Sequence, residues 1–270
     1  MNYLIVFIIV LSILYIYTSY NKKNNYDIYK FNPNTISNYK LNIWIYVNNV
    51  DELQKLCINS IINNCYNCNI IIFQNKDIKT ILGVDTNEFD TQPDLFNKIY
   101  LMHILHKYGG IIIPPYLYLK DNIKKVHNNN KFYICELTNQ RINKSNKNTT
   151  KSMNIMGSNK QNPQLLKFIN LYTNKCKNNF NYDIFKFDTE LLDNLPYIPA
   201  PIIGCKDQNN NEIYLEDLME NKIIEMSDNN IGLYIPYNEL ANRTNYRWYL
   251  KLNQNEMLNV KNFITYYIKS

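Results

Sequence analysis

The stretch LNIWIYVNNVDELQKLCINSIINNCYNCNIIIF, Leu41–Phe73, decides the fold of this chain. Its first seven residues form a short apolar run rich in β-branched and aromatic side chains, which predicts a buried strand. Asp51 can cap the helix that follows, because apolar residues then recur at helical spacing as far as Asn63. Asn69–Phe73 is a second apolar run. The stretch therefore predicts a strand, a helix and a second strand in succession.

The alternation of strands and helices continues beyond this stretch. Asp77–Leu82 predicts a short helix or turn, and Pro93 occupies the first position of a longer helix that Gly109 and Gly110 end. Ile111–Ile113 predicts a third buried strand. This order favours an α/β domain with a mainly parallel sheet flanked by helices.

The remainder of the chain has weaker patterns, and residues 41–270 together have the size of one globular domain. The expected segments are a polar loop at Asn139–Ser152, helices at Pro163–Tyr172 and near Thr189–Leu195, short strands at Ile202–Gly204 and Ile213–Leu215, and an amphipathic helix from Glu256.

The N-terminus is strongly apolar: Tyr3–Tyr17 reads YLIVFIIVLSILYIY, and no charge occurs before Lys22. An uncharged helix of ~18–20 residues matches the hydrocarbon thickness of a bilayer. We therefore expect a transmembrane anchor at residues 1–20, in contact with lipid through residues 3–20, and a polar stalk at residues 21–40. A cleaved signal peptide or a buried core helix are the alternatives. A signal peptide would carry a basic start and a small-residue cleavage site, and this segment has neither.

The orientation of a single-pass anchor follows from its flanking charges. Lys22 and Lys23 lie after the apolar run, so the positive-inside rule predicts a cytosolic domain. Three Asn-x-Ser/Thr sequons, at Asn143, Asn148 and Asn242, would suit a lumenal domain instead, although such sequons arise easily in an Asn-rich chain.

Charge and cysteine content exclude several classes of function. The net charge is +6, but the lysines are dispersed, so a nucleic-acid partner is not expected and a basic surface near anionic lipid is the simpler interpretation. The pair Cys65 and Cys68 lacks the second pair of ligands that a zinc site needs, and it precedes a strand instead of following one. A structural role is therefore favoured over redox or metal chemistry.

A resemblance to known enzymes begins at Leu101–Leu119, LMHILHKYGGIIIPPYLYL. This segment resembles the R-x-x-x-L-x-x-Y-G-G-I-Y-x-D-x-D motif of the initiating mannosyltransferase and capsular-polysaccharide-synthesis glycosyltransferases. Leu105, Tyr108, Gly109 and Gly110 occupy matching positions. The resemblance implies a GT-A-like fold, in which a mainly parallel sheet binds a nucleotide-diphospho-sugar.

Two later segments extend the resemblance to the end of the chain. Met156–Ile169 and Gly232–Leu252 are similar to segments of uncharacterised membrane-anchored proteins of large nucleocytoplasmic DNA viruses that have the same core. The resemblance covers the chain from about Leu41 onward.

The chain departs from the enzymes at the motif that binds the metal. Their two aspartates hold Mg²⁺ or Mn²⁺ against the donor diphosphate, whereas this chain has Pro114, Pro115 and Tyr116 at those positions. The enzymes' donor-binding Asp and Arg correspond to Lys98 and Leu101. The donor-binding remnant is then Lys98, Gly109, Gly110, Pro114 and Tyr116. No metal and no cofactor is expected, unless a transferase with Mn²⁺ or Mg²⁺ and a nucleotide sugar has survived.

Other side chains remain as weak catalytic candidates. Asp121 and Glu136 each follow a strand expected to reach the edge of the sheet where ligands bind. Asp188 and Glu190 lie where the resembling enzymes bind their acceptor, although a helix cap is the simpler role.

A metal-free site would need another source of positive charge. Lys98 and His103 lie on the helix that faces the expected site, where they could neutralise a diphosphate without a metal. The simpler interpretation is that Lys98 is a solvated charge and that His103 and His106 are packed or surface histidines.

The sequence thus predicts a membrane-anchored glycosyltransferase-like domain with a degenerate donor–metal motif and a binding or structural role. The alternative is an active, metal-independent glycosyltransferase that acts on a glycan or glycoprotein. A glycan or a nucleotide sugar is the candidate ligand in either case.

Overall fold

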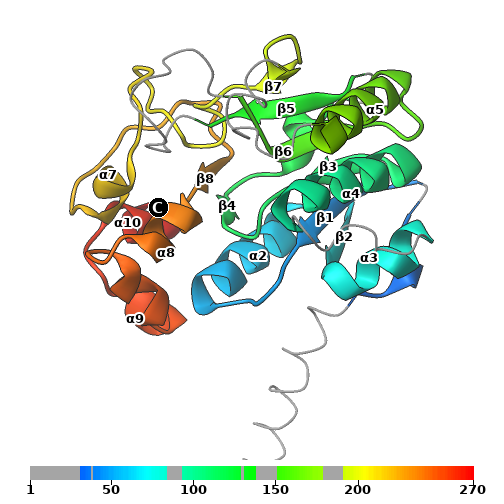
Figure 1. Ribbon diagram of the computed structural model, residues 1–270. Helices are drawn as coiled ribbons and strands as arrows, with labels where there is room; N and C mark the ends of the chain where they lie inside the picture. Colours follow the sequence, from blue (N-terminus) through cyan, green and yellow to red (C-terminus); the bar gives the residue numbers. More distant parts are fainter. Residues whose placement is uncertain (1–30, 38, 84–92, 129–130, 138–150, 179–190) are drawn as a thin grey trace, which may run out of the picture.

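The computed structural model describes residues 31–37, 39–83, 93–128, 131–137, 151–178 and 191–270. Their centre is a six-stranded sheet in the order β2-β1-β3-β6-β5-β7 (Figure 1). β1, β2, β3, β5 and β7 run in one direction, and β6 is antiparallel to both of its neighbours. The strands are β1 (Leu41–Tyr46), β2 (Cys68–Phe73), β3 (Gly110–Ile112), β5 (Tyr133–Glu136), β6 (Lys151–Ser158) and β7 (Tyr197–Ile198). The expectation of a mixed α/β domain with a mainly parallel sheet is confirmed.

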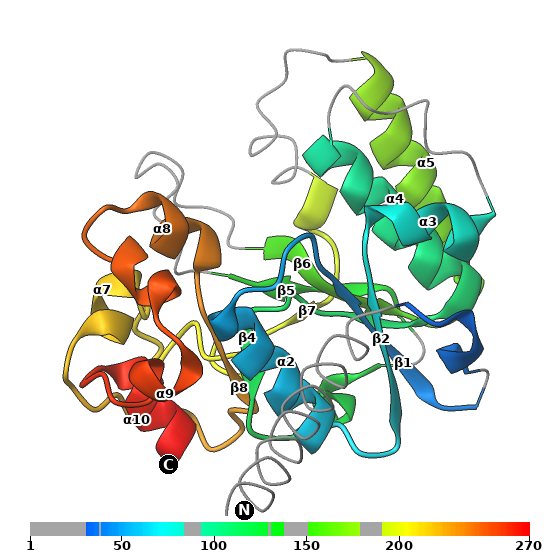
Figure 2. The same ribbon diagram turned by 90° about the horizontal axis from the view of Figure 1, so that it is seen from below.

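Helices cover both faces of this sheet (Figures 1 and 2). On one face, Trp44, Ile71 and Phe73 pack against apolar side chains of α3, α4 and α5. On the other face, Ile43 and Ile45 pack against α2 and a small antiparallel sheet of β4 and β8. The elements are α2 (Glu52–Asn64), α3 (Asn75–Leu82), α4 (Pro93–Tyr108), α5 (Pro163–Asn178), β4 (Leu117–Leu119) and β8 (Gly232–Tyr234).

The C-terminal segment forms a third apolar cluster on the outer side of α2. Leu53 and Cys57 of α2 are fully buried there against short helices. These helices are α7 (Leu215–Met219), α8 (Tyr237–Asn242), α9 (Gln254–Met257) and α10 (Phe263–Lys269), with the 3₁₀ turn η4 (Arg247–Lys251). Two further 3₁₀ turns, η1 (Pro33–Thr35) and η3 (Ile123–Val126), lie before β1 and after β4. Helix α2 therefore joins the central sheet to the C-terminal segment.

The two glycines after α4 are required because the backbone of β3 packs closely against that of β1. Gly110 has φ of 111°, and a Cβ there would lie 2.1 Å from the carbonyl oxygen of Asn42. The indole Nε1 of Trp44 donates a 2.9 Å hydrogen bond to the carbonyl oxygen of Gly109. The expectation that Gly109 and Gly110 end the helix is confirmed, and their conformation sets β3 directly against β1.

Several expectations for the second half of the chain are wrong. Residues 201–204 form turns, not a strand, and Ile213–Leu215 leads into α7. The closing helix expected from Glu256 is two short helices, α9 and α10, separated by a turn. The helix from Pro163 is confirmed and extends to Asn178.

No helix among the described residues is both long and apolar enough to cross a bilayer. The expected anchor at residues 1–20 lies outside those residues, as does most of the loop expected at Asn139–Ser152. Of the helix expected near Thr189–Leu195, residues 191 and 192 are helical and residues 193–195 form a turn and a bend.

Candidate functional site

The parallel strands place their C-terminal ends at one edge of the sheet, where ligands usually bind in open α/β folds. We call this the carboxyl edge, and the opposite one the amino edge. The loops that leave the carboxyl edge begin at Val47 after β1, Gln74 after β2, Ile113 after β3 and Leu137 after β5. The candidate site is the group of side chains that these loops bring together.

At the end of β3, two prolines and a tyrosine occupy the position of the expected metal-binding carboxylates. Pro114 and Pro115 are buried, and the N–H of Leu117 closes a turn by donating to the carbonyl oxygen of Pro114 over 3.3 Å. The turn directs the chain into β4 and leaves Tyr116 at the site. Neither proline offers a side-chain oxygen to a metal.

Tyr116 is part of a cluster with Tyr234 and Tyr237, which we call the tyrosine cluster. Its ring stacks on that of Tyr237, with centroids 5.6 Å apart and planes 14° apart. Its contact with Tyr234 is edge-to-face at 5.5 Å. Aromatic pairs in these geometries add about 0.5–1.5 kcal/mol each beyond area burial. The cluster fixes Tyr116 in place.

Hydrogen bonds engage the phenols of the cluster. Asn154 of β6 donates a hydrogen bond from Nδ2 to the Tyr234 hydroxyl over 2.9 Å. Burial raises the pKa of Tyr116 and raises that of Tyr234 well above its usual value. Burial and then the Asp51 carboxylate raise the pKa of Tyr237. All three phenols are therefore neutral near pH 7 and supply no negative charge for a cation.

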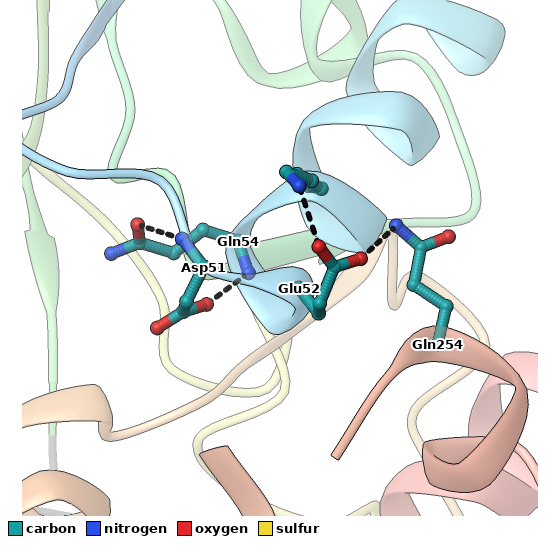
Figure 3. Close-up of polar contacts among 5 residues, drawn as sticks. Asp51, Glu52, Gln54 and Gln254 are labelled. Atoms are coloured by element: carbon teal, nitrogen blue, oxygen red, sulfur yellow. Dashed lines mark hydrogen bonds and ion pairs between the residues drawn. The ribbon is translucent and has the colours of Figure 1, made fainter. Parts of the chain in front are cut away.

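Asp51 is the carboxylate that contacts the tyrosine cluster, and both of its oxygens accept hydrogen bonds within the protein. Oδ1 accepts from the N–H of Gln54 over 2.8 Å and Oδ2 accepts from the Tyr237 hydroxyl over 2.5 Å. The Gln54 side chain completes a capping box at the start of α2 (Figure 3). Glu52 bonds to Lys55 and to Gln254 of α9, which ties α2 to the C-terminal segment. Asp51 thus holds the helix and the cluster together.

Glu136 reaches the carboxyl edge, as expected, but it is held in an ion pair. Its Oε1 lies 3.0 Å from Nζ of Lys206, and its Oε2 accepts from the N–H of Ala200 over 3.0 Å. Both side chains of the pair are mostly buried. In this arrangement Glu136 positions the segment from Ala200 to Lys206, and both of its carboxylate oxygens are engaged within the fold.

Asp121 lies away from the carboxyl edge, which corrects the expectation for the strand before it. It follows β4, and the neighbouring Asn122 donates from Nδ2 to the carbonyl oxygen of Tyr66 in the turn that precedes β2. Asp121 forms an ion pair with Lys125, and the hydrogen bonds from Lys125 and from the backbone of Asn122 lower its pKa. The strand turns away because β4 pairs with β8 and not with the central sheet. Asp188 and Glu190 lie outside the described residues.

The candidates on α4 are a partly buried lysine and two partly buried histidines. α4 begins near the carboxyl edge, so Lys98, in its second turn, lies closer to that edge than His103. Burial, and then the proximity of His106, lower the pKa of His103, which favours a neutral imidazole. Across the described ranges, no three His, Cys, Asp or Glu side chains form a group that could hold a metal ion.

Reasoning from the sequence missed the polar partners of the tyrosine cluster. Asp51 was expected only as a helix cap, and Asn154, Tyr234 and Tyr237 were not singled out. The segment GLYIPYN, residues 232–238, did carry a signal, because it places two tyrosines three residues apart in an otherwise apolar stretch.

Comparison with known proteins finds only distant structural similarity. Neither a protein-family model nor a curated protein sequence matches this chain. Among solved structures, a chain described as "PaToxG Glycosyltransferase" is similar with a TM-score of 0.37 and 16% sequence identity, over 62% of this chain and 72% of that one. A similarity at this level does not show a shared function.

Proposed function

We propose that this chain is a membrane-anchored, GT-A-like domain that has lost its donor–metal site and acts as a binding or structural protein. The resemblance at Leu101–Leu119 supports the relationship to glycosyltransferases, and the mainly parallel sheet is compatible with it. The tyrosine cluster supports the loss of metal-dependent chemistry, and it is the observation that carries the proposal.

The cluster opposes metal binding in two ways. Mg²⁺ and Mn²⁺ prefer several oxygen ligands with negative charge, and two buried prolines and a neutral phenol provide none. In addition, the hydroxyls of Tyr237 and Tyr234 are bonded to Asp51 and Asn154, so recruiting them would break those hydrogen bonds. Each such bond contributes about 0.5–3 kcal/mol. Without the metal, the diphosphate leaving group loses several kcal/mol of stabilisation.

The loops after β1 and β2 form a rim of amide side chains at the carboxyl edge. Asn48 and Asn49 after β1 are exposed, and the Asn48 side chain accepts a 2.7 Å hydrogen bond from the Tyr46 hydroxyl. Gln74 after β2 is partly exposed. Amides both donate and accept hydrogen bonds, so this rim fits the hydroxyl groups of a glycan better than a diphosphate.

The alternative function is a metal-independent glycosyltransferase, favoured by the position of Lys98 near the carboxyl edge. A lysine can neutralise part of a diphosphate charge. His103 does not add to it, because its lowered pKa favours the neutral form.

The membrane part of the proposal rests on residues 3–20, and Lys22 and Lys23 favour a cytosolic domain. The resemblance of the later segments to viral proteins favours a virion or host internal membrane. Carbonate extraction of membranes that contain the full chain tests it. The protein should stay in the pellet, added protease should digest the domain on sealed vesicles, and Asn242 should carry no glycan. A protected and glycosylated domain would reverse the orientation.

Thermal melting tests the site. Ligand at a hundredfold excess over Kd adds about 2.7 kcal/mol to stability, which corresponds to several degrees in melting temperature for a domain of this size. We expect no change with millimolar UDP-sugar or GDP-sugar and Mn²⁺. A Mn²⁺-dependent rise would overturn the proposal. A metal-independent rise that disappears in Lys98→Ala would support the alternative enzyme.

A further inference from the structure

We propose that the amino edge of the sheet carries a surface that docks on anionic lipid. The surface consists of Tyr39, Lys40, Tyr66, Lys124 and Lys125, and we call it the tether face. The inference rests on the membrane anchor of the proposed function and adds to it which side of the domain meets the membrane.

Strand pairing places the two tyrosines of the tether face at the same edge of the sheet. Leu41, the first residue of β1, is paired with Cys68, the first residue of the parallel strand β2. Tyr39 and Lys40 are the two residues before β1, and Tyr66 lies two residues before the start of β2. Tyr39 is 100% exposed and Tyr66 is 68% exposed.

The loop after β4 brings two further lysines to the same edge. Asn122 is buried, donates to the carbonyl oxygen of Tyr66 over 3.0 Å, and accepts from the N–H of Lys124 over 2.9 Å. Lys124 and Lys125 belong to the 3₁₀ turn η3, which Asn122 caps. Both lysines are exposed. Asp121 pairs with Lys125, so the face keeps a positive excess of two charges from three lysines and one aspartate.

The chain enters the domain at this face. Ser37 is fixed to Asn42 of β1 by two hydrogen bonds of 2.9 and 3.1 Å, and the carbonyl oxygen of Thr35 accepts one from Asn69 of β2. Ten residues, 21–30, separate the apolar run from Phe31. Ten residues span at most about 36 Å when fully extended, so a membrane anchor keeps the amino edge near the bilayer.

The composition of the tether face fits a lipid surface. Tyrosines are enriched at the level of lipid headgroups, and lysines are attracted to the anionic cytoplasmic leaflet. One lysine close to such a surface favours association by about fivefold. The carboxyl edge then points away from the membrane, so the candidate site faces the cytosol.

Lysine labelling of the full-length protein in liposomes tests this orientation. One set of liposomes is phosphatidylcholine alone and the other includes phosphatidylserine, and a membrane-impermeant amine reagent is quantified at each lysine by mass spectrometry. We expect labelling of Lys40, Lys124 and Lys125 to fall about fivefold in the anionic liposomes. Lys76, exposed in the first turn of α3 at the carboxyl edge, is the internal control and should be unchanged. At 1 M salt, where the screening length shrinks to about 3 Å, the protection should disappear.

Charge reversal provides the matched variants. Lys124→Glu/Lys125→Glu should remove the protection of Lys40, whereas Lys76→Glu/Lys79→Glu, with the same change of charge on exposed residues of α3, should retain it. Equal labelling of the tether face in both lipids would overturn the docking surface. Carbonate extraction of the same liposomes reports separately on the anchor, so release of the protein would contradict the anchor while the labelling ratio still decides the tether face.

Discussion

The hydroxyl of Tyr237 donates a 2.5 Å hydrogen bond to the carboxylate of Asp51, a residue 186 positions earlier in the chain. This single contact links the C-terminal segment to the cap of α2, and through the stacked ring of Tyr116 it links both to the end of β3. The stability of the fold and the shape of the candidate site therefore depend on the same side chains.

Tyr237→Phe removes this hydrogen bond and keeps the ring stacked on Tyr116. A hydrogen bond to a charged acceptor contributes about 1.5–3 kcal/mol, so we expect a loss of roughly 1–2 kcal/mol for this partly exposed group. Each kcal/mol corresponds to about 2–4 °C in the melting temperature of a domain this large. Tyr266→Phe, at an exposed position, is the control and should melt like the wild type. Equal melting of both variants would show that the contact contributes no stability.

Pro114→Asp/Tyr116→Asp restores two carboxylates at the end of β3. We expect a lower melting temperature, because the charges are placed at buried or partly buried positions and the stacking on Tyr237 is lost. Melting with and without Mn²⁺ and GDP-sugar measures both effects, and Pro114→Ala/Tyr116→Phe is the control. A Mn²⁺-dependent stabilisation of the aspartate variant would show that the rest of the donor site is intact, contrary to our prediction.

Gly110→Ala should be among the most damaging single changes. The substitution combines a positive φ with a Cβ 2.1 Å from a backbone oxygen, and strain and overpacking each cost about 1–3 kcal/mol. Gly83→Ala is matched to it, because Gly83 also has positive φ but a Cβ there meets nothing within 4 Å. Chemical denaturation should show a loss of about 1–2 kcal/mol for Gly83→Ala and clearly more for Gly110→Ala. Similar losses would mean that β3 can move away from β1.

Stability should fall at alkaline pH. Burial raises the pKa of Cys65 to about 11 and those of Cys135 and Tyr249 to about 12, whereas unfolded thiols and phenols titrate near 8.5 and 10. Above about pH 9 the folded state therefore binds more protons than the unfolded state, and stability decreases as pH rises. Melting should be constant from about pH 7 to 8 and decline steadily above about pH 9. The decline should be shallower in Cys65→Ala/Cys135→Ala, and an unchanged slope would exclude these thiols as its cause.

The first half of the fold was predictable because its signals are local. Leu41–Phe73 combines a buried apolar run with a capped helix, and both signals act within a few residues. Ile202–Gly204 resembles a strand in composition, but these residues form turns, in which the N–H groups of Ile202 and Gly204 donate to the carbonyl oxygens of Pro199 and Pro201. Ile203 is fully buried in those turns. Apolar composition reports burial, and it does not distinguish a strand from a packed turn.

The candidate site was only partly predictable for a related reason. The loss of the carboxylates at Pro114 and Tyr116 is visible in the sequence, but the residues that fill their place come from distant segments. Asp121 was assigned to the wrong edge, because the local sequence around it gives no information on which sheet β4 joins. Pairing between distant segments is set by tertiary packing and leaves little trace in single-sequence periodicity.

The position of α2 between two apolar clusters has a consequence for synthesis on the ribosome. Among the described residues, most of the side chains that cover Leu53 and Cys57 lie from Ile213 onward, and these emerge roughly 150 residues later. At about 5–20 residues per second, that side of α2 stays exposed for roughly 8–30 s during translation. The nascent chain therefore exposes the apolar face of α2 well before the C-terminal segment is synthesised, which makes it a substrate for chaperones at that stage. Truncation before Ile213 should yield a product that aggregates.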